Sequence, residues 1–217
     1  MPSIAAMAAA SPPASELARR LQGLNLYLVG MMGAGKSAVG RPLAEALGYR
    51  FVDADSVIAQ TAGRSIPEIF ASDGETGFRD LETAVLDSIA HWHSLVVATG
   101  GGVVTRPRNW GHLQQGVVIW LDAPQELLLA RLVADSTPRP LLAQADPAER
   151  LGALLAERRP LYGQADLSVE QLEEESPSQI AHKVLEALPA ILRERQQAPE
   201  AAAQLLDEAG QPTPSLN

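Results

Sequence analysis

The chain contains no cysteine, and this absence removes several classes of function at once. Disulfide-bonded scaffolds, thiolate zinc sites and cysteine nucleophiles are excluded, and a reducing compartment is compatible with the composition. No apolar run reaches the roughly 18 residues of a membrane span. Positive charge is also scarce, since the net charge is −9 and the pI about 4.9. This argues against a nucleic-acid partner, so an anionic substrate must be bound by locally placed arginines.

The ends of the chain differ in composition from its middle. Residues 1–23 are rich in Ala, Ser and Pro and lack the compact apolar segment of a secretory signal. We expect them to form a disordered tail, with a short organellar presequence as the alternative. Residues 196–217 are rich in Ala, Glu, Gln and Pro, which indicates a second disordered tail. One folded domain is therefore expected at residues 24–195, in a cytoplasmic protein.

Strand-like and helix-like segments alternate within that domain. Short apolar runs predict buried strands at residues 26–29, 50–52, 95–98, 117–121 and 167–169. Apolar residues at helical spacing predict helices at residues 38–47, 56–61, 80–89, 124–133, 147–159 and 177–193. Ser65 and Glu68 resemble a capping box that opens a further short helix. Repeated β–α units predict an α/β fold of three layers, with a parallel sheet between helices and ligands at the carboxyl ends of the strands.

The segment from Gly30 to Ser37 matches the phosphate-binding P-loop pattern G-x-x-x-x-G-K-[ST]. It lies between a predicted strand and a predicted helix, which is the context that the motif requires. Backbone N–H groups and the helix N-terminus would surround phosphate oxygens. Lys36 can reach the outer phosphates, and the Ser37 hydroxyl can ligate Mg²⁺. The alternative is a glycine-rich turn that matches by chance.

Two carboxylates, Asp53 and Asp55, follow the second predicted strand and face the phosphate site. One can hold Mg²⁺ through water, because magnesium keeps much of its hydration shell. The other can accept a proton from an attacking hydroxyl or align that hydroxyl. The alternative is that Asp55 only caps the helix that follows it.

Three arginines have both a functional and an ordinary interpretation. Arg79 precedes Glu82 by three residues, so the two could form a surface ion pair, or Glu82 could hold Arg79 in place to grip a carboxylate. Arg158 ends a predicted helix, where a cation also suits the helix dipole. Arg139 lies in a Pro-rich segment, which is either a linker or a mobile lid that brings an arginine to a transferring phosphate.

Three consecutive glycines, 100–102, follow Thr99 at the end of the third predicted strand. Such a run is entropically costly, so it indicates a sharp turn or a ligand in contact with the backbone.

Together these segments resemble the shikimate kinase family over nearly all of residues 24–195. The matching segments, in order, are GMMGAGKSAVGRPLA, FVDADSVI, GRSIPEIFASDGETGFRDLE, TGGGVV, RPLL and RRPLY. The resemblance implies a fold like that of nucleoside monophosphate kinases, with strand order 2-3-1-4-5 and a lid. It implies transfer of the ATP γ-phosphate to the 3-hydroxyl of shikimate, in the pathway to chorismate and aromatic amino acids.

The resemblance also assigns roles to residues. It implies catalytic roles for Lys36, Asp55 and Arg139, and shikimate binding by Asp55, Arg79, Gly101 and Arg158. It implies a Mg²⁺ site at Ser37 and Asp53, and ATP binding by Gly33, Ala34, Gly35, Lys36, Ser37, Ala38, Arg131 and Arg139. Arg131 is placed against adenine, although the segment between it and Arg139 is a residue longer than in some relatives. The adenine loop falls at residues 172–177, where three glutamates predict backbone contacts or side chains turned to solvent.

Two other functions remain as alternatives. One is another small-metabolite P-loop kinase, such as gluconate kinase or a nucleoside monophosphate kinase, and the other is a catalytically idle binding protein with the same fold. We expect small-molecule substrates, no nucleic-acid or membrane partner, and a monomer.

Overall fold

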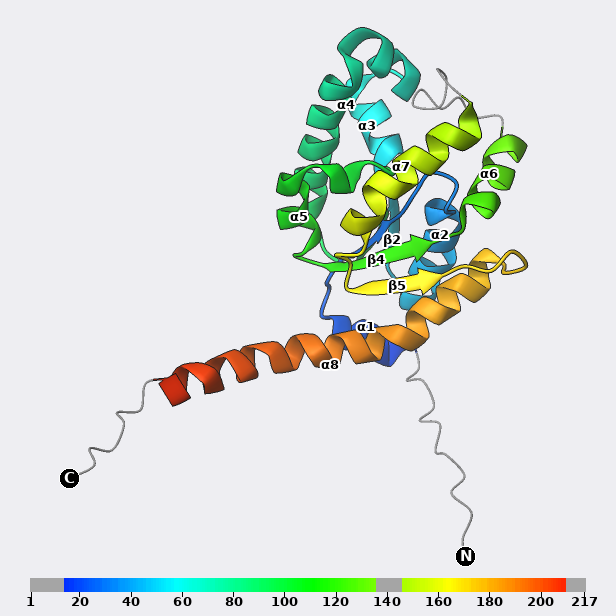
Figure 1. The fold of residues 1–217 in the computed structure, drawn as a ribbon. Helices are drawn as coiled ribbons and strands as arrows, with labels where there is room; N and C mark the ends of the chain where they lie inside the picture. The colour runs from blue at the N-terminus through cyan, green and yellow to red at the C-terminus, as the bar shows by residue number, and fades with distance from the viewer. Residues whose placement is uncertain (1–13, 136–145, 210–217) are drawn as a thin grey trace, which may run out of the picture.

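Five strands form one parallel sheet at the centre of the molecule, in the order β2-β3-β1-β4-β5 (Figure 1). The computed structural model describes residues 14–135 and 146–209, with side chains described as far as residue 195. The strands are β1 Leu26–Val29, β2 Arg50–Asp53, β3 Leu95–Ala98, β4 Val117–Asp122 and β5 Leu167–Glu170. Neighbouring strands all pair in parallel. The expected fold class and strand order are confirmed.

Helices cover both faces of the sheet. They are α1 Ala14–Leu21, α2 Lys36–Leu47, α3 Ala54–Ala62, α4 Ile66–Ala90, α5 Pro107–Leu113, α6 Gln125–Ala134, α7 Pro147–Tyr162 and α8 Pro177–Ala209, with a 3-10 turn η1 Val103–Thr105. Among the described helices, none is both long enough and apolar enough to cross a lipid bilayer.

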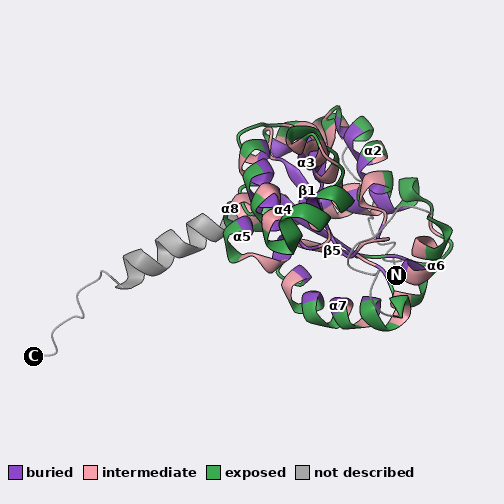
Figure 2. Cartoon of the chain, turned by 90° about the horizontal axis from the view of Figure 1, so that it is seen from above, coloured by how far each residue is buried: buried purple, intermediate pink, exposed green. Residues whose placement is uncertain are grey.

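The alternation of side chains along β1 explains the three layers. All four residues of β1 are buried. Leu26 and Leu28 belong to the apolar cluster that includes α1, α2 and α8. Tyr27 and Val29 point to the other face and belong to the cluster built with α3, α4 and α5. Figure 2 shows this burial in the strands and on the inner sides of the helices, while the outer sides of α5 and α7 are exposed.

The chain ends depart from the expectation of two tails. Residues 14–21 form α1, in which Leu17 and Leu21 are 1% and 0% exposed. This short helix packs against α2 and α8 (Figure 1). A composition-based expectation does not register such a contact, because a few residues of one short helix make it: Leu17 and Leu21 in the core and Arg20, which donates to the Pro189 carbonyl oxygen of α8 at 3.3 Å. At the other end α8 continues to Ala209, so residues 196–209 are helical.

Three elements in the middle of the chain, α4, α5 and η1, differ from what the sequence predicts. The two helices expected around residues 65 and 80–89 are parts of α4, whose helical geometry is interrupted at Gly74 (φ 70°, ψ −176°). The capping box is confirmed, since Glu68 accepts from the Ser65 N–H at 2.7 Å and its own N–H bonds the Ser65 hydroxyl. The helix α5 and the turn η1 were not expected, because they are short and follow a glycine run.

Candidate active site

The P-loop occupies the connection between β1 and α2. Gly30 has a φ of 140°, and a Cβ there would lie 2.7 Å from the carbonyl oxygen of Leu121. Only glycine fits this position, both in conformation and in space. The Lys36 Nζ donates to the carbonyl oxygens of Gly30 and Met31 at 2.8 and 3.0 Å. The ammonium group is therefore held within the curve of the loop.

The two aspartates after β2 have different environments. Asp53 Oδ2 accepts from the Ser37 hydroxyl at 2.6 Å, and its Oδ1 accepts from the Ser56 N–H at 3.1 Å. Asp53 is thus the N-cap of α3, so the alternative that made Asp55 the cap is wrong. Asp55 lies in the first turn of α3, is half-buried and lines the cavity described below.

Arg79 and Glu82 form a buried pair on one turn of α4. The guanidinium Nη1 donates to Glu82 Oε2 at 2.8 Å, and the two side chains are only 7% and 2% exposed. Burial raises the pKa of Glu82 above its usual value, and the charge of Arg79 offsets part of this rise. The more exposed Glu75 accepts from Nη2 at 3.2 Å. The Arg79–Glu82 pair is therefore not a surface ion pair, because both of its side chains lie inside the molecule.

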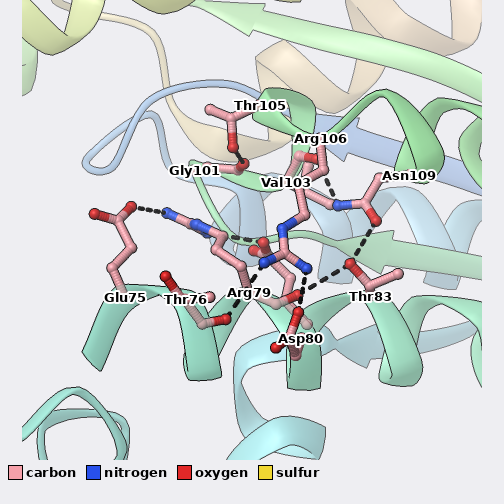
Figure 3. A network of polar contacts seen from close by, with 12 residues as sticks. Glu75, Thr76, Arg79, Asp80, Thr83, Gly101, Val103, Thr105, Arg106 and Asn109 are labelled. Atoms are coloured by element: carbon pink, nitrogen blue, oxygen red, sulfur yellow. Dashed lines mark hydrogen bonds and ion pairs between the residues drawn. The ribbon is translucent and has the colours of Figure 1, made fainter. Parts of the chain in front are cut away.

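A polar network fixes α4 against the segment after β3 (Figure 3). The Thr83 hydroxyl bonds the Arg79 carbonyl oxygen and the side chain of Asn109, each at 2.9 Å. Asn109 in turn donates to the Val103 carbonyl oxygen at 2.7 Å. Arg106 donates to Asp80 at 2.6 Å. These bonds set the distance between Arg79 and the glycine run.

Each glycine of the run 100–102 faces a close neighbour. A Cβ at Gly100 would lie 2.6 Å from Glu82 Oε1 and 3.0 Å from Asp55 Oδ1. A Cβ at Gly101 would lie 3.2 Å from the N of Met32 in the P-loop. A Cβ at Gly102 would lie 2.0 Å from Arg79 Nη2. The run is therefore more than a turn, because its backbone packs directly against the side chains and the loop that line the cavity.

Near the end of α7, Arg158 lines the cavity and the fully buried Tyr162 bonds the glycine run. The Tyr162 hydroxyl donates to the Gly101 carbonyl oxygen at 2.5 Å, and burial raises its pKa to about 12. Arg158 is 3% exposed. Its Nε and Nη1 have no hydrogen-bond partner among the described residues. Buried donors without partners indicate a place for an acceptor, and a carboxylate suits a guanidinium best.

Arg131, on α6, also lines the cavity, beside the P-loop. Its Nη1 donates to the carbonyl oxygen of Gly33 at 3.3 Å and to Gln171 at 2.9 Å. Burial lowers the pKa of this guanidinium. Arg139 falls outside the described residues. In the expected adenine loop, Glu173 and Glu174 are exposed, while Glu175 bonds Lys183 and the Leu172 N–H.

One cavity of about 890 Å³ brings most of the candidate residues together. Its lining includes Gly33, Gly35, Lys36, Ser37, Ala38, Asp53, Asp55, Arg79, Gly101, Arg131 and Arg158. Ala34, in the same loop, is fully buried and is not among the lining residues. A cavity of this size suits two small ligands side by side, and its lining combines the phosphate-binding loop with three arginines.

Comparisons with known proteins show the family of this chain. A family model described as shikimate kinase matches residues 32–189. A shikimate kinase of Synechococcus sp. (strain RCC307) is 62% identical over 181 residues, which are 83% of this chain and 92% of the relative. The chain belongs to the shikimate kinase family.

Solved structures of shikimate kinases have the same fold. One from Acinetobacter baumannii in complex with shikimate has a TM-score of 0.76 and 41% identity, covering 80% of this chain and 97% of that one. A gluconokinase from Sinorhizobium meliloti 1021 has a TM-score of 0.55 and 18% identity, covering 82% and 98%. The second likeness extends to the fold alone.

Two buried residues of the site were not anticipated as functional. Tyr162 was part of a matching segment but had no expected role, and Gln171 belonged to no motif. Gln171 follows a strand and is 1% exposed. A glutamine directly after a predicted strand was the only available signal, and it is a weak one.

Proposed function

We propose that this protein transfers the γ-phosphate of ATP to the 3-hydroxyl of shikimate, giving shikimate 3-phosphate and ADP. The observation that carries the proposal is the pair of buried arginines, Arg79 and Arg158, opposite Asp55 and next to the P-loop. Two guanidinium groups suit a small carboxylate, and Asp55 suits a hydroxyl. Gluconate is also a polyhydroxy acid, but the kinase of that class resembles this chain in fold only.

The acceptor is held by three groups in this proposal. Arg79 and Arg158 bind the carboxylate of shikimate, and the backbone at Gly101 contacts its ring substituents. Asp55 accepts a hydrogen bond from the attacking hydroxyl and takes its proton as the oxygen bonds to the γ-phosphorus. The bond from that phosphorus to the β–γ bridging oxygen breaks, and ADP leaves.

The donor is held by the loop from Gly33 to Ala38. Backbone N–H groups of Gly33, Gly35, Ser37 and Ala38 contact the phosphates, and the Lys36 ammonium group neutralises charge that develops on them. Ala34 shapes the loop for this contact, since its N–H donates to the Met31 carbonyl oxygen at 3.1 Å. Arg131 contacts the base. Arg139 reaches the phosphates from the lid. Little covalent chemistry is left to the protein, so positioning and charge neutralisation account for most of the catalysis.

The oxygen donors of Ser37 and Asp53 fit a magnesium ion. They lie 2.6 Å apart at the edge of the cavity, and Mg²⁺ prefers oxygen ligands with several waters retained. No group of three or more His, Asp or Glu able to hold a metal occurs among the described residues. The ion would therefore depend on phosphate oxygens and water besides these two residues. When bound, it neutralises phosphate charge and orients the β- and γ-phosphates.

An assay of ADP release tests the proposal. We expect turnover that requires shikimate and is absent with gluconate or a nucleoside monophosphate. Asp55→Asn and Lys36→Met should each lower kcat by at least about 100-fold. Asp87→Asn, which changes an aspartate on α4 that lies outside the cavity lining, is the matched control and should keep wild-type kinetics.

Two outcomes would reject the assignment. Turnover of gluconate or a nucleotide without turnover of shikimate would favour another kinase. Calorimetric binding of ATP and shikimate without ADP formation would favour an idle binding protein.

We also propose that the enzyme is a cytoplasmic monomer with small-molecule substrates only. The acidic net charge of −9 supports the absence of a nucleic-acid partner. Sedimentation at several concentrations would test the monomer.

A further inference from the structure

Gln171 connects two parts of the nucleotide side of the cavity. It follows β5 directly, and its backbone N–H continues the strand pairing by donating to the Asp122 carbonyl oxygen at 2.8 Å. Its side-chain Nε2 donates to the Ala34 carbonyl oxygen at 3.0 Å. Its Oε1 accepts from Arg131 Nη1 at 2.9 Å. One buried amide thus bonds the P-loop and the arginine at the same time.

The hydrogen bonds of Arg131 restrict the orientation of its guanidinium group. The Nη1 nitrogen carries two hydrogens, and they match its two acceptors, Gln171 Oε1 and the Gly33 carbonyl oxygen. Because a guanidinium is planar, fixing one nitrogen to two separate segments fixes the orientation of the whole group. A Cβ at Gly35 would lie 3.7 Å from the same nitrogen, so the arginine packs along the loop. Arg131 is also one of the residues that line the cavity.

An amide is the side chain that suits this place. It supplies an acceptor for the arginine and a donor for the Ala34 carbonyl oxygen. A carboxylate would pair with Arg131 but would face the carbonyl oxygen without a donor. An apolar side chain would leave the buried Ala34 carbonyl oxygen without this bond, which is costly, and would leave the half-buried Arg131 with one acceptor fewer.

We propose that Gln171 is a positioning residue for the nucleoside triphosphate. By holding Arg131 against the P-loop backbone, it makes the arginine and the loop one preformed wall of the ATP subsite. The proposal rests on the proposed function, because it requires Arg131 to contact ATP. Without Gln171, the arginine would have to be ordered when ATP binds, and that ordering weakens binding.

Steady-state kinetics with Gln171→Met, Arg131→Ala and the double variant test the proposal. Methionine matches glutamine in length but cannot form the two hydrogen bonds. We expect Gln171→Met to raise the KM for ATP about 3- to 10-fold and to leave the KM for shikimate within about twofold. The effect should vanish in the Arg131→Ala background, as expected for residues that act as one unit. The control is Gln115→Met, since Gln115 is exposed and the one hydrogen bond given for its side chain among the described residues goes to the Gly111 carbonyl oxygen.

A binding measurement adds a readout that a purely structural role would not change. Calorimetry with ADP and with inorganic tripolyphosphate separates the base and ribose from the phosphates. Gln171→Met should weaken ADP binding by the same factor as the KM for ATP and leave tripolyphosphate binding within about twofold. If Gln171→Met fails to fold, Gln171→Glu keeps an acceptor for Nη1 and should raise the KM for ATP by about twofold to threefold.

The outcomes separate this inference from the proposed function. Equal rises in both KM values, or an unchanged effect of Gln171→Met in the Arg131→Ala background, would overturn the role of Gln171. An Arg131→Ala effect on ATP with none from Gln171→Met would overturn it too, while leaving the ATP contact of Arg131 in place. No effect of Arg131→Ala would overturn both. If shikimate is not phosphorylated at all, the proposed function fails, and ADP binding still decides the role of Gln171.

Discussion

Gly102→Ala should disable the acceptor side of the site by displacing Arg79. A Cβ at Gly102 would lie 2.0 Å from Nη2, 2.3 Å from Cζ and 2.5 Å from Nη1 of that arginine. Gly102 has a φ of −101°, so alanine can adopt its backbone conformation. The effect of the methyl group is therefore steric, and Arg79 must move because the two cannot occupy the same space.

The size of the effect follows from what Arg79 loses. Moving the guanidinium breaks its bond to Glu82, which is 2% exposed, and removes one of two proposed carboxylate contacts. A hydrogen bond to a charged group is worth about 1.5–3 kcal/mol, so kcat/KM for shikimate should fall about 10- to 150-fold. The KM for ATP should stay within about threefold. Overpacking of this kind lowers the free energy of unfolding by about 1–3 kcal/mol.

Gly111→Ala is the matched control for this steric argument. Gly111 lies inside α5, has no positive φ, and no atom lies within 4 Å of a Cβ placed there. It should keep wild-type kinetics and gain up to about 1 kcal/mol in stability, because alanine favours the helix. Adding Gly102→Ala to an Arg79→Ala variant should cost no further activity. Wild-type shikimate kinetics in Gly102→Ala, or an equal rise in the KM for ATP, would refute the reasoning.

Two other substitutions distinguish a residue proposed to bind the acceptor from a residue that only stabilises the fold. Arg158→Ala should raise the KM for shikimate about 10- to 150-fold and the KM for ATP far less, and equal effects on both would count against its carboxylate role. Leu17→Ala should lower the free energy of unfolding in urea by about 2–5 kcal/mol without changing kcat or either KM, because Leu17 is 1% exposed between α1 and its neighbours. An unchanged urea midpoint would show that α1 adds nothing to the stability of the domain.

The sheet could be predicted from the sequence because its signals are local. Strands buried on both faces appear as short apolar runs, and those at residues 26–29 and 95–98 agree with β1 and β3 to the residue. The order of the strands came from the family resemblance and could not have come from the runs themselves. The helix α1 was missed because its stability depends on contacts with α2 and α8, which are distant in sequence.

The residues of the candidate site also form two groups: those that a sequence pattern reveals and those that only the fold brings together. Lys36, Ser37 and the glycines of the P-loop lie close together in the chain, so their pattern is visible without a fold. Gln171 is separated from Arg131 by 40 residues and from Ala34 by 137. No spacing rule joins such residues, so only the folded arrangement reveals the contact. The N-cap of α3 could not be assigned from the sequence either. Asp53 and Asp55 both suit an N-cap by residue type, and the backbone geometry of the folded chain selects Asp53.

The glycine run connects the two proposed substrate subsites and would keep the distance between them fixed. The backbone of Gly101 lies against the P-loop at Met32, while its carbonyl oxygen accepts from Tyr162 at the end of α7. Gly102 lies against Arg79 on its other side. The acceptor side is therefore joined to the donor loop by packed backbone, which has little freedom compared with flexible side chains. In-line phosphoryl transfer depends on holding two reactants near 3–3.5 Å apart, so this rigid contact is what the chemistry needs most.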